Sequence, residues 1–267
     1  MLPLPTYTLS ERIRDAQRQG KTRVAVLMLS GALNPVHNGH LEAMEVCRAA
    51  IETFFGVAVV QGYVIPSSER YVDGKQAKKG QPSLSLADRV TLCDWALAEE
   101  LASTIPQRID MRGIQLEVWE VAGADFALRR KLWRPPHSLD EQRHRRIICL
   151  ERQPATDTIR HEIVRHTHHL PLTATVRQQH VTAHIVPFSC HGNMLVVGGM
   201  FVLLTGAGTL MRLSDASSTR VRKELGRDGG REMVRAGWMS REVVEAMQGM
   251  HWRQEGSYGR HRRRSGA

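Results

Sequence analysis

The sequence has no apolar run long enough to cross a bilayer. Its longest run, Met194 to Leu204, is interrupted by Gly198-Gly199, whereas a membrane-spanning helix needs about 20 apolar residues. The opening stretch, MLPLPTYTLSERIR, also lacks the apolar core of a secretory signal. We therefore expect no membrane segment and an intracellular protein, in the cytoplasm or the nucleus.

Cysteine is scarce, and no pair has the CxxC spacing of a redox or zinc motif. The four cysteines stand far apart, three of them in apolar stretches: Cys47, Cys93, Cys149 and Cys190. This pattern is typical of buried, reduced thiols. Histidines gather between residues 161 and 191, but His161 and His166 form HExxxH, one residue too long for both to share a helix face. We expect no protein-held metal site.

Acidic residues are outnumbered, with 27 Asp and Glu against 37 Lys and Arg, and the net charge is +10. A positive balance suits polyanionic partners, either ATP or nucleic acid. Part of the excess is local, because residues 251–267 hold five arginines and one glutamate in a Gly- and Ser-rich context. We interpret this segment as a basic, disordered tail.

The stretch GALNPVHNGH, residues 31–40, is the most informative in the chain. An apolar, β-branched run from Val24 to Leu29 precedes it and predicts a buried strand, and a helical apolar pattern follows from Gly39 to Phe54. Free N–H groups at a helix N-terminus, together with the helix dipole, favour an anion. With His37 and His40 at this point, the sequence predicts a phosphate-binding turn.

The rest of the chain alternates between predicted strands and helices, which favours parallel crossover units. Strands are predicted at 57–65, 116–122, 147–150 and 181–188, and helices at 10–19, 85–102, 217–226 and 232–250, the last broken at Gly237. Residues 66–84 are interpreted as a polar loop. A two-residue hairpin is predicted around Gly198-Gly199.

Three motifs resemble those of one enzyme superfamily. GALNPVHNGH resembles the GxFxPxHxGH signature of nucleotidyltransferases, with Leu33 in place of the usual Phe, and residues 217–222 resemble the SSTxxR motif. Gly123-Ala124-Asp125 followed by Leu132-Trp133 resembles the GAD and LW elements of the nicotinamide/nicotinate mononucleotide adenylyltransferases. The resemblance covers most of residues 23–248. It implies a Rossmann-like, doubly wound, mostly parallel sheet with a C-terminal helical portion.

The resemblance also implies roles for individual residues. His37, His40 and Arg222 would be catalytic, and Asn34 and Trp133 would bind the mononucleotide, with Trp133 stacking on the pyridine ring. Trp133 is flanked by Lys131 and Arg134, which makes it a poor candidate for burial. The implied ATP-binding residues are Ser30, Gly31, Ala32, His40, Lys78, Lys79, Gly123, Asp125, Ser217, Ser218, Thr219 and Arg222. Either Lys78 or Lys79 would contact phosphate, and without the resemblance Asp125 is a helix cap.

The implied reaction transfers AMP from ATP to nicotinamide or nicotinate mononucleotide, with Mg²⁺ accompanying ATP, and forms the dinucleotide and pyrophosphate. Two alternatives stay open. A related nucleotidyltransferase would use another phosphate acceptor, and a nucleic-acid-binding protein would use the basic tail. The enzyme hypothesis does not require a nucleic-acid partner, and it is compatible with a homo-oligomer.

The predicted domain organisation has three parts. Residues 1–22 form an N-terminal helical extension, residues 23–250 form the nucleotidyltransferase domain with an insertion at about 189–210, and residues 251–267 form the tail. At 267 residues, the chain is long enough for one large α/β domain or for one domain with insertions.

Overall fold

The computed structural model describes residues 9–97, 113–167, 174–178, 181–188, 198–206 and 218–250. The chain divides into two compact units, and each is described by itself. The sheet unit comprises Met1–Ser30, Leu41–Val64 and Ala102–Ser214, and the helical unit comprises Gly31–His40, Ile65–Leu101 and Asp215–Ala267.

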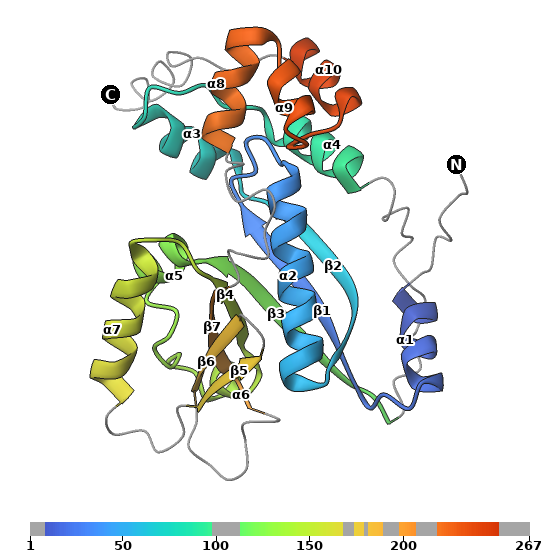
Figure 1. The fold of residues 1–267 in the computed structure, drawn as a ribbon, viewed down its shortest axis with the longest axis vertical. Coiled ribbons are helices and arrows are strands. Elements are labelled where there is room, and N and C mark those ends of the chain that lie inside the picture. The colour runs from blue at the N-terminus through green and yellow to red at the C-terminus, as the bar shows by residue number, and fades with distance from the viewer. Residues whose placement is uncertain are drawn as a thin grey trace, which may run out of the picture. The chain divides into compact units, whose positions relative to one another are not determined.

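The sheet unit is built on a seven-stranded sheet of order β2-β1-β3-β4-β7-β6-β5 (Figure 1). The strands are β1 (Arg23–Gly31), β2 (Ala58–Pro66), β3 (Gln115–Gly123), β4 (Arg146–Leu150), β5 (Ala174–Gln178), β6 (Val181–Pro187) and β7 (Met200–Thr205). β1, β3, β4 and β7 pair in parallel, whereas β6 pairs antiparallel with both β5 and β7. Because the chain moves to opposite sides of β1 to form β2 and β3, the sheet is doubly wound. The predicted α/β, Rossmann-like class is confirmed.

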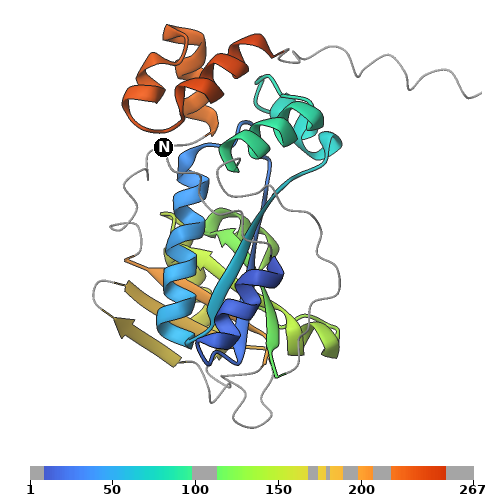
Figure 2. The same ribbon diagram turned by 90° about the vertical axis from the view of Figure 1, so that its right-hand side faces the viewer.

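Helices cover both faces of this sheet (Figures 1 and 2). The body of α2 (Asn38–Phe55) packs Met44, Cys47 and Ile51 against one face. On the other face, α1 (Leu9–Arg18) packs Ile13 and Ala16 against β1 and β2. α5 (Ala124–Arg130) and α7 (Ala155–Thr167) cover β4 and β7. Two-sided burial explains why β4 is apolar along almost its whole length.

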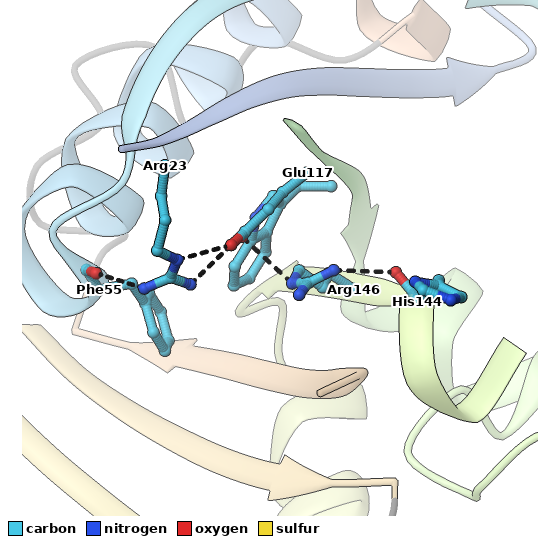
Figure 3. Close-up of polar contacts among 6 residues, drawn as sticks. Arg23, Phe55, Glu117, His144 and Arg146 are labelled. Atoms are coloured by element: carbon cyan, nitrogen blue, oxygen red, sulfur yellow. Dashed lines mark hydrogen bonds and ion pairs between the residues drawn. The ribbon is translucent and has the colours of Figure 1, made fainter. Parts of the chain in front are cut away.

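A buried charge cluster lies at the amino-terminal ends of the internal strands β1, β3 and β4 (Figure 3). The carboxylate of Glu117 is fully buried and accepts two hydrogen bonds from Arg23, at 2.9 and 2.7 Å, and one from the indole of Trp119. Arg146 forms an ion pair with the same carboxylate at 3.1 Å. Burial lowers the pKa of Arg146, and Glu117 opposes that shift. The cluster ties β1, β3 and β4 together near their amino-terminal ends.

β7 differs from the predicted hairpin strand. Its partners are β4 and β6, so the described part of the segment predicted as an insertion is an internal strand of the sheet. The predicted first strand of the hairpin, residues 195–197, lies outside the described residues. The short helix α6 (Leu139–His144) precedes β4.

The helical unit corrects the prediction of a polar loop at residues 66–84. That stretch contains α3 (Glu69–Ala77), which buries only Val72 and Gln76 and has no side-chain cap bond at Ser68. Its local signal is therefore weak, and tertiary packing supplies most of its stability. α4 (Leu86–Leu97) follows as predicted, and Ser85 caps it by accepting the Asp88 N–H at 3.0 Å.

Three C-terminal helices complete the helical unit: α8 (Ser218–Asp228), α9 (Arg231–Arg235) and α10 (Arg241–Gly249). The predicted break falls at Gly237, whose φ of +71° suits glycine between α9 and α10. Among the described helices, none combines the length and the apolar character that crossing a bilayer requires.

Candidate functional site

The histidine turn, residues 31–40 with His37 and His40, begins where β1 ends. Gly31 accepts a hydrogen bond from the Ser67 N–H at 2.7 Å, and Ala32 accepts one from Arg89. Ser30, the preceding residue of β1, is exposed. Leu33 adopts a φ of +42°, which a branched, non-glycine residue rarely does. Such outliers concentrate at functional sites, where the surroundings must hold them in place.

Three backbone N–H groups at the start of α2 are not free, contrary to the prediction. The His37 N–H donates to Nδ1 of His40 at 3.2 Å, the Asn38 N–H to the Trp238 carbonyl at 2.8 Å, and the His40 N–H to the His37 carbonyl at 2.8 Å. These three amides are satisfied within the protein. These three amides are therefore not available to an anion, which raises the importance of a side-chain donor.

The geometry of His40 fits such a donor. Because its Nδ1 accepts the His37 amide, the proton of the neutral ring lies on Nε2, which makes that nitrogen a hydrogen-bond donor. The His37 ring is almost fully buried, and its centroid lies 3.9 Å from that of His40. His37 thus supports the His40 ring from one side.

Arg222 reaches the same turn from α8. Its Nη1 donates to the Asn34 carbonyl, and its Nη2 donates to Gln81 Oε1 at 2.7 Å and to Thr219 Oγ1 at 3.3 Å. A longer contact of 3.5 Å joins Nη2 to Gln76 Oε1. The Nε atom is buried and has no hydrogen-bond partner among the residues that the structure describes.

All of these acceptors are neutral. Within the described part of the chain, no carboxylate forms an ion pair with Arg222, and burial lowers its pKa to about 10. The guanidinium is still charged at neutral pH. A partly buried cation without an anionic partner is costly unless a ligand supplies the charge. The arrangement therefore suits binding of an anion.

Lys78 and Lys79 lie in the tight turn that joins the two glutamines. The Lys79 and Gln81 N–H groups both donate to the Gln76 carbonyl, at 2.8 and 3.1 Å, and both lysine side chains are exposed. Because Gln76 and Gln81 both contact Arg222, the turn places two further cations close to that guanidinium.

The hydroxyl-rich start of α8 is partly structural. Ser218 donates to the Pro35 carbonyl at 2.9 Å and thereby ties α8 to the histidine turn. Thr219 is exposed and contacts Arg222. Ser217 lies outside the described residues.

Asn34 is also engaged by the protein. Its side chain is fully buried, accepts the Leu84 N–H at 2.9 Å and donates to the Pro82 carbonyl at 3.2 Å. These bonds fix the loop before α4 against the histidine turn. A contact of Asn34 with a mononucleotide stays a prediction.

Two positioning residues escaped the sequence analysis. Arg89 is fully buried and donates to the carbonyls of Ala32, Ser67 and Leu84, at 3.1, 2.6 and 3.3 Å, which links three loops. Asn38 donates its side-chain amide to the Gly237 carbonyl at 2.9 Å. The only sequence signal for Arg89 is that an arginine falls within the apolar pattern of α4. Asn38 has no such signal.

The sheet unit holds the remaining predicted residues. Gly123 ends β3, and a methyl group added there would meet no atom within 4 Å. Asp125, in the first turn of α5, forms an ion pair with Arg152 at 3.0 Å, and both side chains are at least half exposed. β1 and β3 are adjacent parallel strands on either side of the point where the strand order reverses. Ligands of open α/β sheets bind at the carboxyl ends of such strands.

The expectation that Trp133 is poorly placed for burial is wrong. Its side chain is 3% exposed, packs in the core with Leu132 and Ala127, and meets the Phe201 ring edge-on at 6.5 Å. Within the described ranges, the indole Nε1 has no hydrogen-bond partner. Trp133 is thus a core residue in this structure, and its stacking on a pyridine ring stays a prediction.

Metal-ligating side chains do not gather anywhere in the described ranges: no three His, Cys, Asp or Glu residues are placed to hold an ion. His161 is exposed and hydrogen-bonds the Asp157 carbonyl within α7. Cys47, Cys93 and Cys149 are buried, as predicted. Burial raises the pKa of the Cys47 and Cys149 thiols, so both stay protonated.

Comparison with known proteins gives one relative to report. The chain is 36% identical over 95 residues to a nicotinamide/nicotinic acid mononucleotide adenylyltransferase from Oryza sativa subsp. japonica. The match covers 36% of this chain and 34% of the relative, so it spans about a third of each. No family model matches the chain. Over that third, the chain resembles one nucleotidyltransferase.

Proposed function

We propose that the protein is a nucleotidyltransferase that transfers AMP from ATP to nicotinamide or nicotinate mononucleotide. One observation carries the phosphate-binding part of the proposal: Arg222, a partly buried guanidinium held only by neutral acceptors, lies against the histidine turn. The choice of reaction rests on the motifs and on the partial similarity to the rice adenylyltransferase.

The reaction needs positioning and charge stabilisation more than proton transfer. A 5′-phosphate oxygen of the mononucleotide attacks the α-phosphorus of ATP, a new P–O bond forms, the bond from the α-phosphorus to the bridging oxygen breaks, and pyrophosphate leaves. The nucleophile is already ionised at neutral pH, so no general base is required. Catalysis of such a step comes from orientation and from fixed positive charge around the phosphates.

The helical unit supplies the groups for this task. His40 would donate from Nε2 to the phosphate chain, with His37 supporting its ring. Arg222 would bind the departing pyrophosphate, aided by Lys78 or Lys79 from the adjacent turn. Mg²⁺ would arrive with ATP as part of the substrate, because its preferred ligands are phosphate oxygens and water in such sites.

For the sheet unit, we propose that Gly123 and Asp125 bind the ribose or adenine of ATP. The open space at Gly123 supports close approach of a ligand to this backbone. Ser30, in β1, would also bind ATP, and for the helical unit we propose the same of Gly31 and Ala32. We propose that Asn34 and Trp133 bind the mononucleotide.

The direct test is a pyrophosphate-release assay with ATP and each mononucleotide. We expect release that depends on both substrates, together with formation of the dinucleotide. Release with phosphopantetheine or glycerol phosphate in place of either mononucleotide would assign the chain to a related transferase with another acceptor. Salt-dependent binding of RNA or DNA that is lost on deleting residues 251–267, without any turnover, would favour a nucleic-acid-binding protein.

A further inference from the structure

Two glutamines hold Arg222, and both come from the turn that ends α3. Gln81 accepts from Nη2 at 2.7 Å, and Gln76 lies 3.5 Å from the same nitrogen. Gln76 is itself 3% exposed, which is unusual for a glutamine. Since a guanidinium only donates hydrogen bonds, each glutamine must present its oxygen to Arg222.

The acceptor chosen at these positions is informative. A carboxylate in place of either amide would pair with the buried cation and offset its desolvation. Glu117 pairs in this way with Arg23 and Arg146 in the sheet unit. At Arg222 the acceptors fix the geometry of the guanidinium but leave its full charge in place.

We propose that Gln76 and Gln81 are positioning residues that orient Arg222 while preserving its charge for a phosphate group of the ligand. This inference rests on the proposed function, because it takes the ligand of Arg222 to be the pyrophosphate portion of ATP. The cost of the unpaired cation is then a stability cost of the ligand-free protein, and ligand binding offsets it. Affinity and stability are therefore opposed at these two residues.

The test is the variant Gln81→Glu in the full chain, with inorganic pyrophosphate as the probe. We expect pyrophosphate to bind about 10- to 100-fold more weakly, because the new carboxylate neutralises one charged donor. We expect the Tm of the ligand-free protein to rise, because the same carboxylate pairs with Arg222. Calorimetric titration and thermal unfolding measure the two quantities. Gln76→Glu should change both in the same directions.

The matched control is Gln115→Glu, which makes the same change of charge at an exposed position of β3. We expect this control to leave both the affinity and the Tm unchanged. If the wild-type protein binds pyrophosphate and Gln81→Glu binds it equally well, the inference is overturned while the proposed function stands. If Gln81→Glu lowers the Tm or fails to fold, a purely structural role explains the glutamine and the inference is again overturned. If the wild-type protein does not bind pyrophosphate, the proposed function fails first.

Discussion

Replacing Arg222 with lysine tests the anion site most directly, because it keeps the charge and changes only the shape of the donor. The guanidinium now spans the Asn34 carbonyl and Gln81 Oε1 through two different nitrogens, and its Nε is still unsatisfied. A lysine ammonium is a single point and cannot hold both anchors while facing a phosphate. We therefore expect Arg222→Lys to bind triphosphate poorly.

The magnitude follows from the number of charged hydrogen bonds lost. If one charged bond to a phosphate oxygen is lost, the cost is about 1.5–3 kcal/mol, which corresponds to roughly 10- to 150-fold in affinity. The fold itself should be little affected, because Arg222 is paired with no carboxylate in the described residues. The KM for ATP should rise by that factor, and the KM for the mononucleotide should hardly move.

Steady-state kinetics with each substrate varied in turn, and calorimetry with pyrophosphate, measure these effects. Arg227→Lys is the matched control, since Arg227 lies on the same helix and is exposed. Equal weakening of both substrates, or no weakening of either, would refute the assignment of Arg222 to the triphosphate and leave it as a structural residue.

Three further predictions concern other parts of the proposed site. His40→Ala should lower kcat about 10²- to 10³-fold, by analogy with lost oxyanion donors. The control His161→Ala, on the exposed face of α7, should leave kcat unchanged. Near-normal turnover of His40→Ala would remove the histidine turn from the mechanism. Gly123→Ala should fold and melt like the wild type, because its added methyl group meets no protein atom, yet weaken ATP binding; unchanged ATP affinity by calorimetry would place the nucleotide elsewhere. Trp133→Ala should lose about 3–5 kcal/mol of unfolding free energy in urea titrations, because its ring is buried. Trp133→Phe should keep most of that stability. If both variants bind the mononucleotide normally, Trp133 serves only to stabilise the core.

The local pattern of the sequence determined strands β1, β2, β3, β4 and β6 and the position of the histidine turn. The strand at Val24–Leu29 and the helix after Gly39 are long, strongly apolar or periodic segments, and such segments specify their own conformation. Gly237 likewise marked the break between α9 and α10 through its backbone preference. Polar α3 escaped detection because its stability comes from burying Val72 and Gln76, which no local pattern reveals.

Only the tertiary structure decided which neutral groups hold Arg222. Asn34, Arg222 and the pair Gln76 and Gln81 come from three distant parts of the sequence, and they meet because α3, α8 and the histidine turn pack within the helical unit. A glutamine in a polar stretch gives no sign that it holds a buried cation. The burial of Trp133 depends equally on Phe201, a residue of a distant strand. Burial and charge pairing depend on which residues are close in space. The sequence gives only the order of residues along the chain, so it does not reveal these contacts.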